Sequence, residues 1–167
     1  MHVAVAVEDV VDDLEEKPEL GRERAPGAVL GLALSCGADV ARELIDATLA
    51  MIGGQQQDLE GGHDLASLHR LKTGALFTAS IMCGVRSAGV PEGGHGPWRT
   101  FAAELGLLFQ VVDDILDGDG YVVEVGETRA RQLADDAAAR ADSRLAAIPA
   151  DTSVLAEMVA MLAARTS

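Results

Sequence analysis

The chain is 167 residues long, with 49% hydrophobic, 24% charged and 3% aromatic residues, which favours one folded domain and argues against global disorder. Its 27 acidic and 13 basic residues give a formal net charge of −14, which argues against nucleic-acid binding because phosphate backbones require clustered Lys and Arg. An anionic membrane would also repel this charge, and the absence of a run of roughly 18 apolar residues predicts no membrane span.

The first predicted element covers residues 2–16. Its apolar start favours a helix, although alternating Val and Ala also fit a strand. It lacks the leading positive charge and the small-residue cleavage site of a signal peptide. Cys36 and Cys83 each stand alone in an apolar context, which favours buried thiols in a reducing compartment over a disulfide or a zinc site. We therefore expect a cytoplasmic protein.

The rest of the chain predicts helices separated by breaks that contain Gly and Pro. Asp39 is a candidate N-cap for the helix that ends near Gly61, and Pro97 suits the first turn of the helix that ends near Asp117. The helices are expected at about residues 27–36, 39–60, 64–88, 97–117, 127–148 and 152–165, with loops at 17–26 and 89–96. We interpret residues 1–167 as one all-α domain of six or seven helices.

An acidic stripe lies near the end of the helix predicted at 97–117. Gln110, Asp113, Asp114 and Asp117 follow the spacing i, i+3, i+4 and i+7, which places them on one side of a helix. A chance cluster on a solvated face is the alternative. Because the other faces of this helix are apolar, we favour acids that line a cavity and bind a divalent cation such as Mg2+.

A second acidic run, near the start of the chain, has the same spacing. Glu8, Asp9 and Asp12 lie at i, i+1 and i+4. Alone, this run fits a solvated surface. Paired with the stripe at 110–117, it forms a plausible opposite wall, so that metal ions between the two runs hold a diphosphate.

Two further polar patches interrupt apolar helices. Gln55 and Asp58 share a helix face, although they also fit an ordinary helix end. Lys72 and Thr73 lie inside an apolar segment, where the lysine either reaches solvent along its apolar stem or contacts a phosphate. His69 receives no role. The sequence contains no pattern typical of a nucleophilic triad or a P-loop.

Three motifs resemble, in their order and spacing, those of the trans-isoprenyl diphosphate synthases. They are Gly54-Gln55…Asp58, Lys72-Thr73-Gly74-Ala75 and Phe109-Gln110-Val111-Val112-Asp113-Asp114-Ile115-Leu116-Asp117. These synthases form the polyprenyl synthetase family, which includes farnesyl and geranylgeranyl diphosphate synthases. The resemblance implies a partial polyprenyl synthetase domain. Its fold would be an all-α, isoprenoid synthase-type helical bundle around a central cavity, with the N-terminal helices of the family missing.

The resemblance also implies an activity and its residues. The expected reaction is the Mg2+-dependent condensation of isopentenyl diphosphate with an allylic diphosphate. Catalytic roles fall to Lys72, Thr73 and Gln110. These three and Gln55 would bind substrate. The metal ligands would be Glu8, Asp9, Asp12, Asp113, Asp114 and Asp117.

The expected product is a short prenyl diphosphate. The resemblance implies that the residues just before the first acidic run form the floor of the chain pocket. Val3 and Ala4 occupy that stretch, and their small size favours geranylgeranyl over farnesyl diphosphate. The resemblance implies a homodimer, or a heterodimer with a full-length synthase.

Other readings stay open because basic residues of the family are absent. Gly118-Asp119-Gly120-Tyr121 follows the second acidic motif where the family has lysines. The chain could therefore be a non-catalytic subunit or a truncated remnant of such a synthase. A terpene cyclase is a more distant alternative, because it shares the fold and the use of metal.

Overall fold

The computed structural model describes residues 31, 33–61 and 64–166, and these are helical throughout apart from turns and short connections. The α-helices are α3 (Ala38–Glu60), α4 (Leu65–His69), α5 (Ala75–Ser87), α6 (His95–Asp117), α7 (Gly120–Val125), α8 (Glu127–Ala146) and α9 (Ser153–Ala164). A π-helical turn, η1 (Arg70–Gly74), joins α4 to α5, and a 3-10 turn, η2 (Glu92–Gly94), precedes α6. The described residues contain no strand, so the predicted all-α fold is confirmed.

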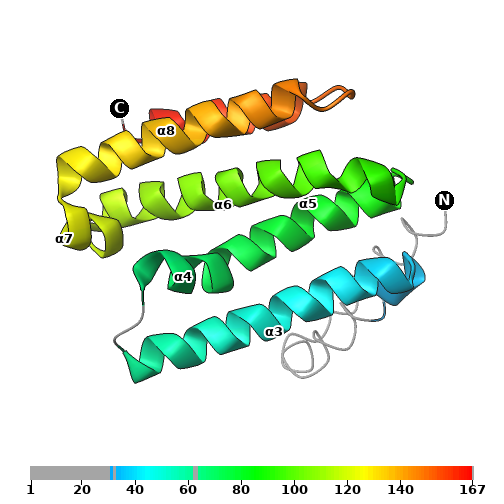
Figure 1. The fold of residues 1–167 in the computed structure, drawn as a ribbon, viewed down its shortest axis with the longest axis horizontal. Helices are drawn as coiled ribbons and strands as arrows, with labels where there is room; N and C mark the ends of the chain where they lie inside the picture. Colours follow the sequence, from blue (N-terminus) through cyan, green and yellow to red (C-terminus); the bar gives the residue numbers. More distant parts are fainter. Residues whose placement is uncertain (1–30, 32, 62–63, 167) are drawn as a thin grey trace, which may run out of the picture.

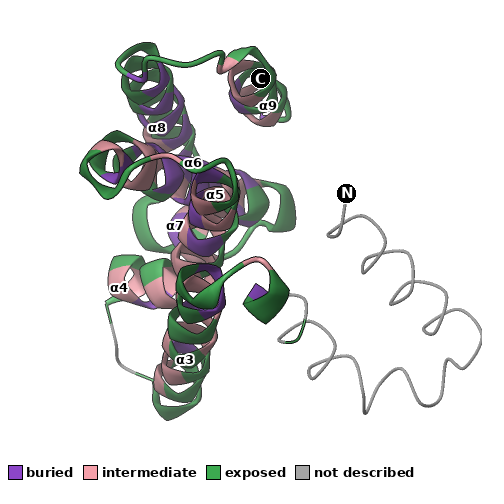
Figure 2. Cartoon of the chain, turned by 90° about the vertical axis from the view of Figure 1, so that its right-hand side faces the viewer, coloured by how far each residue is buried: buried purple, intermediate pink, exposed green. Residues whose placement is uncertain are grey.

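The helices stack in layers around α6 (Figure 1). Helix α5 lies between α3 and α6, and α8 packs against the opposite side of α6. The end-on view in Figure 2 shows the same order, with α9 beside α8 and the short α4 beside α3. Helix α6 is therefore the central element, and whatever its C-terminal end carries is positioned by packing on both sides.

The core forms between α6 and α8. Helix α6 buries large apolar side chains at i, i+4, i+7 and i+11, and α8 presents alanines that allow a close approach. These residues, each at most 1% exposed, are Phe101, Leu105, Leu108 and Val112 on α6 and Ala130, Ala134, Ala137 and Ala141 on α8. The spacing of these residues thus places them on the faces through which the two helices pack.

Glycines end the long helices where the sequence indicated. Helix α3 stops at Gly61, with φ of 73°, and α6 stops at Gly118, with φ of 72°, a backbone conformation that favours glycine. The predicted cap at the start of α3 is wrong: Gly37 is the N-cap, and Asp39 lies inside the first turn without a side-chain capping bond. Helix α7 was not predicted.

The helix expected over about 64–88 begins as predicted but is not uniform. Asp64 caps it by accepting a hydrogen bond from the Ser67 backbone N–H at 2.8 Å. Its second turn is the π-helical η1, which contains Lys72 and Thr73. Single π-turns inserted in α-helices are frequent at functional sites. The predicted helix at 2–16 lies outside the described residues.

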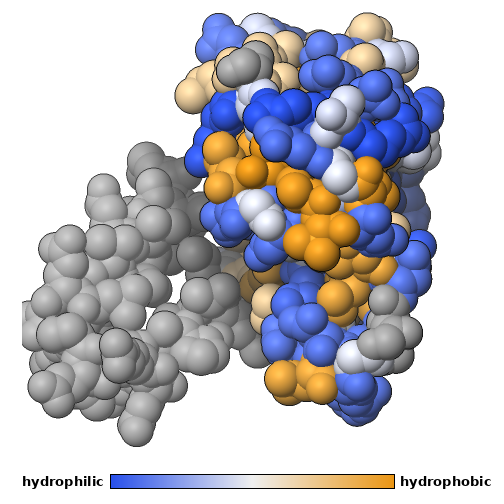
Figure 3. All heavy atoms as spheres, turned by 90° about the vertical axis from the view of Figure 1, so that its left-hand side faces the viewer, coloured by the Kyte–Doolittle hydropathy of each residue, from blue (hydrophilic) through white to orange (hydrophobic). Residues whose placement is uncertain are grey.

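Some apolar side chains face outward. Figure 3 shows apolar atoms gathered on the end of the molecule that carries α7, where Leu116, Val123 and Val125 are exposed. Across the part of the chain that the structure describes, no helix is both long enough and apolar enough to cross a bilayer.

The α6–α8 core gives the first testable prediction. Leu105→Ala removes a side chain that is 1% exposed, so we expect it to lower the free energy of unfolding by about 2–5 kcal/mol in urea denaturation. Val123→Ala, at a position 76% exposed, is the control and should change it by about 0.5 kcal/mol or less. Similar losses at both positions would contradict this account of the core.

Candidate functional site

A chain of side-chain hydrogen bonds joins η1 to α6. The Thr73 hydroxyl donates to Gln110 Oε1 at 2.6 Å, and Gln110 Nε2 donates to Asp114 Oδ1 at 2.7 Å. The backbones approach closely here, since a Cβ on Gly106 would lie 3.2 Å from the Cα of Gly74. Three of the residues predicted from sequence are therefore linked.

Asp114 is the inward-facing member of the acidic stripe. Its side chain belongs to a residue only 3% exposed, and its Oδ2 accepts a hydrogen bond from the Tyr121 backbone N–H at 2.8 Å. Its backbone carbonyl accepts from the N–H groups of Gly118 and Asp119 at 2.9 and 3.1 Å. Asp114 thus contacts the turn between α6 and α7 through both its backbone and its side chain.

Asp113 and Asp117 lie one helical turn apart and are exposed. Partial burial raises the pKa of Asp113, and the negative charges of Asp117, Asp114 and Asp119 raise it further, while Arg165 lowers it. The part of this rise that comes from the neighbouring carboxylates is electrostatic repulsion between like charges. A divalent cation would relieve that repulsion.

The Asp113–Asp117 pair offers the oxygen ligands that Mg2+ prefers, but two carboxylates alone are too few to complete its coordination. Hard divalent cations prefer oxygen ligands, and Mg2+ commonly uses one or two carboxylates together with phosphate oxygens and water. Within the described ranges, no group of three or more His, Cys, Asp or Glu side chains is arranged to hold a metal ion. The other predicted acidic ligands, Glu8, Asp9 and Asp12, lie outside the described residues.

Lys72 forms an ion pair with Asp58. Its Nζ lies 2.6 Å from Asp58 Oδ2, with the two side chains 31% and 40% exposed, and the pair connects η1 to α3. Gly54 permits this approach, because a Cβ there would lie 2.9 Å from the Cγ of Lys72. An ion pair this exposed is worth about 1 kcal/mol or less, so the ammonium group can exchange partners. Gln55 is exposed on the same end of α3.

His69 is a member of the site that the sequence did not reveal. Its imidazole packs edge-on against the Tyr121 ring at a centroid distance of 5.2 Å, and its Nδ1 lies 3.8 Å from Asp114 Oδ2. Burial lowers the pKa of His69, although the charge of Asp114 opposes this effect. The lowered pKa favours the neutral form of the imidazole. Only tertiary packing brings these residues together, and their spacing in sequence carries no signal of it.

A pocket of about 1040 Å³ opens between α3, α5 and α6. Gln110, His69 and Tyr121 line one end of it, and Glu43, Arg86 and Arg99 line the other. Of the predicted site residues within the described ranges, Gln110 alone is part of its wall. The carboxylates of Asp113, Asp114 and Asp117 and the side chain of Lys72 do not line it, so we do not assign this pocket to the predicted substrates.

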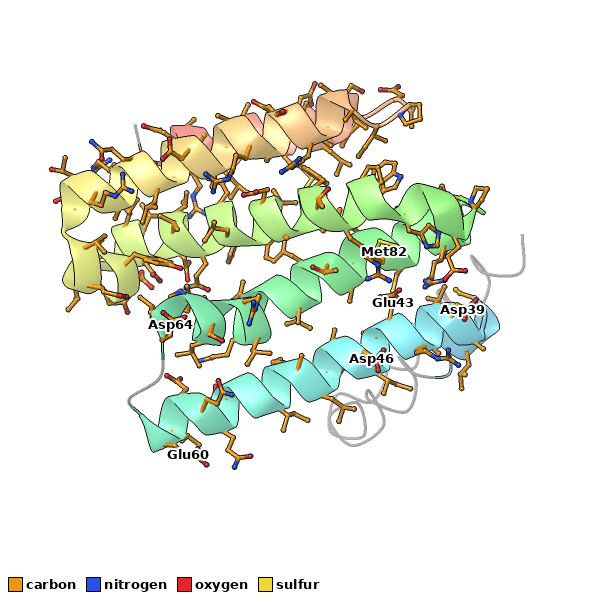
Figure 4. The ribbon with its side chains drawn as sticks, viewed as in Figure 1. Asp39, Glu43, Asp46, Glu60, Asp64 and Met82 are labelled. Atoms are coloured by element: carbon orange, nitrogen blue, oxygen red, sulfur yellow. The ribbon has the colours of Figure 1, made fainter. Side chains whose placement is uncertain are left out.

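A charge cluster closes the far end of this pocket. Figure 4 shows Glu43 and Asp39 on α3, and Arg86 of α5 lies 2.9 Å from Glu43 Oε1 through Nη2. Arg99 of α6 donates to both carboxylate oxygens of Glu43. Burial acts to raise the pKa of Glu43, but the hydrogen bonds and charges of the two arginines outweigh it and leave the pKa below its usual value. This cluster fastens three helices together.

The fold and this polar end define an α-helical protein with several carboxylates at the end of α6. Comparison with known proteins is more specific, because the family model described as Polyprenyl synthetase matches residues 28–141. The chain belongs to the polyprenyl synthetase family, which confirms the resemblance seen in its motifs.

Several relatives share this family. The chain is 37% identical to "Farnesyl diphosphate synthase" of Bacillus subtilis (strain 168) over 93 residues, covering 51% of this chain and 31% of that protein. It is 40% identical over 90 residues to "Geranylgeranyl pyrophosphate synthase 4" of Arabidopsis thaliana, covering 48% and 24%. It is 37% identical over 115 residues to "Geranylgeranyl pyrophosphate synthase, chloroplastic" of Capsicum annuum, covering 68% and 30%. The matched region is about a third or less of each relative's length.

The Glu43 cluster gives the second prediction. Since the folded-state pKa of Glu43 is depressed, its contribution to stability is complete above the ordinary value of 4.5 and is lost as the pH falls through the folded-state pKa. We expect Glu43→Gln to destabilise the protein by roughly 1–3 kcal/mol at pH 7. Urea denaturation at a series of pH values should show this difference shrinking below pH 4.5.

Glu127→Gln is the matched control. Glu127 pairs with Arg131 one turn along α8, and both side chains are well exposed, so its loss should cost about 0.5 kcal/mol or less. A Glu43→Gln penalty that is independent of pH, or no larger than that of the control, would contradict the assigned role of the cluster.

Proposed function

We propose that the chain takes part in prenyl transfer, the Mg2+-dependent condensation of isopentenyl diphosphate with an allylic diphosphate. The observation that carries this proposal is the exposed pair Asp113 and Asp117, placed one turn beyond the Thr73–Gln110 hydrogen bond in a member of this family. A diphosphate that brings Mg2+ to this pair would lie close to the Asp113 and Asp117 carboxylates and to the hydrogen-bonded side chains of Thr73 and Gln110.

The carboxylates would act through the ion. Asp113 and Asp117 would supply oxygen ligands, and the predicted run Glu8, Asp9 and Asp12 would supply the opposite set. When bound, Mg2+ neutralises the diphosphate and makes it a better leaving group. Phosphate oxygens and water would supply the rest of the coordination, as is common for Mg2+.

The neutral and basic residues would position the substrate. Lys72 would exchange its exposed partner Asp58 for a diphosphate oxygen, which is a stronger electrostatic partner. The hydrogen bond between Thr73 and Gln110 holds both side chains in one orientation beside the carboxylates. Gln55, exposed at the end of α3, would complete the substrate contacts.

Departure of the diphosphate would leave an allylic cation that water would quench. The rings of Phe77 and Phe109 pack with their centroids 4.9 Å apart. Phe109 directly precedes Gln110, and Phe77 lies one helical turn after Thr73. Aromatic faces stabilise a cation that lies within about 6 Å, and apolar rings exclude water. These two rings therefore suit the apolar side of such a site.

The identity of the product and the assembly state form the finer part of the proposal. The small residues Val3 and Ala4 favour geranylgeranyl over farnesyl diphosphate, and a homodimer is the assembly that the family resemblance implies.

A second candidate function is a non-catalytic subunit that pairs with a full-length synthase. One observation favours it: α3 exposes Ile45, Leu49 and Ile52 at i, i+4 and i+7. Such an apolar helix face is typical of a surface that packs against another helix.

The third prediction tests the metal pair. The chain is incubated with Mg2+, isopentenyl diphosphate and dimethylallyl, geranyl or farnesyl diphosphate, and products are identified by mass spectrometry. We expect Asp113→Asn to lower turnover by about 100-fold or more, because a ligand to the ion that stabilises the leaving group is lost. Asp135→Asn, an exposed change on α8, should leave turnover unaltered.

Equal turnover by the two variants would refute the assignment of Asp113. Absence of product from folded wild-type protein would favour the subunit, which would then co-purify with a full-length polyprenyl synthetase. Absence of product and of any such complex would leave the truncated remnant.

The fourth prediction concerns Lys72. Lys72→Ala should raise the KM for the allylic diphosphate about tenfold, because a charge-assisted phosphate contact is lost. Its free energy of unfolding should change by about 1 kcal/mol or less, since the ion pair with Asp58 is exposed. Asp58→Asn is the control and should not raise the KM. A larger loss of stability with unchanged KM would show that Lys72 is structural.

A further inference from the structure

The three aspartates of the stripe at 113–117 do not share one environment. Asp113 and Asp117 are exposed, whereas Asp114 is 3% exposed and lies against the turn that follows α6. A residue one position along a helix points about 100° away, so α6 can present two acids outward and turn the third inward. The inward acid therefore requires a role of its own.

We propose that Asp114 is a positioning residue and not a ligand of the metal: its carboxylate fastens the α6–α7 turn and Gln110, and thereby holds Asp113 and Asp117 toward the ion. This inference rests on the proposed function, since it concerns the same site.

The hydrogen bonds of Asp114 come from both directions. Gln110 Nε2 donates to Oδ1 from within α6, and the Tyr121 N–H donates to Oδ2 from α7. The backbone carbonyl of Asp114 accepts the N–H groups of Gly118 and Asp119. One residue therefore accepts the first N–H groups beyond the end of α6 and the N–H of Tyr121. A metal ion on Oδ2 would have to displace a buried backbone donor, which is costly.

The backbone of Gly120 lies directly against the Asp114 carboxylate. Gly120 has a φ of +45°, and a Cβ at this position would overlap Oδ2 and Cγ of Asp114. Gly118, two residues earlier, also has positive φ, at +72°, but a Cβ there would have no heavy atom within 4 Å. The close contact is thus specific to Gly120 and encloses the carboxylate.

His69 and Tyr121 close the remaining side. The two rings pack edge-on, and His69 Nδ1 lies 3.8 Å from Asp114 Oδ2, which is beyond hydrogen-bond distance. The imidazole therefore acts as a wall that keeps Asp114 away from solvent. Together with the Thr73–Gln110–Asp114 hydrogen bonds, this wall connects η1 to the last turn of α6.

The first experiment separates an anchor from a ligand by a conservative change. In Asp114→Asn the side-chain oxygen can still accept from the Tyr121 N–H, and the side-chain NH2 can donate to the oxygen of a Gln110 amide turned by 180°. The NH2 group of Gln110 would then donate to the Thr73 hydroxyl, which can accept as well as donate. Mn2+ binding in the presence of inorganic pyrophosphate is measured by electron paramagnetic resonance. Asp114→Asn should keep the wild-type affinity within about threefold, whereas Asp113→Asn should lose about tenfold or more.

Equal losses in Asp114→Asn and Asp113→Asn would overturn the inference, because they would make Asp114 a ligand. Asp114→Leu should weaken Mn2+ binding as well, since it removes both acceptors. Retention of full affinity by Asp114→Leu would also overturn the inference, because no anchor would then be required.

The second experiment uses the two glycines and needs no bound metal. Both Gly118→Ala and Gly120→Ala place a side chain at positive φ, but only Gly120→Ala meets the Asp114 carboxylate. Amide hydrogen exchange should accelerate about tenfold or more at Tyr121 in Gly120→Ala relative to Gly118→Ala, while the amides of the α6–α8 core stay protected in both. Equal exchange at Tyr121 would overturn the anchor.

The two experiments distinguish a failure of the proposed function from a failure of the anchor role of Asp114. If wild-type protein binds no Mn2+ with pyrophosphate, the proposed function and the role of Asp114 toward an ion are both refuted. The exchange result at Tyr121 would still decide whether Asp114 anchors the turn.

Discussion

The packing of α6 is the constraint on which the rest of the structure depends. One side of this helix buries large apolar residues against the alanines of α8, and another contacts η1 and α5 through Gly106 and Gly74. Because α6 is held from both sides, its last turn has a fixed orientation. The aspartates at that end, the Gln110 amide and the turn to α7 are placed by this packing and then connected by hydrogen bonds.

Two polar systems depend on this packing, at opposite ends of α6. Glu43 with Arg86 and Arg99 forms a charge-balanced cluster, in which the carboxylate is satisfied by its arginines. Asp113 and Asp117 are the opposite case, since burial and the charges of Asp117, Asp114 and Asp119 together raise the pKa of Asp113, against the opposing charge of Arg165. A balanced cluster stabilises the fold, whereas an unbalanced one has charge available for a ligand. This difference, together with family membership, supports the assignment of function to the α7 end.

Much of the fold could be predicted from sequence because its signals are local. Pro97 and the apolar residues around the aspartates predicted a buried helix over about 97–117, and Gly61 and Gly118 marked helix ends through their backbone freedom. The prediction of Asp39 as the N-cap of α3 was wrong. It relied on the preference of aspartate for this position, but Gly37 is the N-cap. Helix α7 was missed, because two glycines and an aspartate indicated only a break.

The candidate site was less predictable because it depends on tertiary contacts. Spacing placed Asp113, Asp114 and Asp117 on one stripe but could not show that α7 returns over Asp114 and leaves the other two exposed. The pairing of Lys72 with Asp58 and the packing of His69 on Tyr121 join segments whose separation in sequence carries no periodic signal. The roles predicted for Glu8, Asp9 and Asp12 stay predictions, since those residues lie outside the described part of the chain.

The most direct test of the central claim is to locate the bound ion. Mn2+ shortens the relaxation of nearby nuclei, so a titration of isotopically labelled protein with Mn2+ and inorganic pyrophosphate would identify the amides closest to the metal. The account predicts that the resonances of Asp113 and Asp117 broaden first, together with their neighbours at the end of α6. Earlier broadening at other exposed acids, such as Asp135 and Asp136 of α8, with Asp113 and Asp117 unaffected, would contradict it.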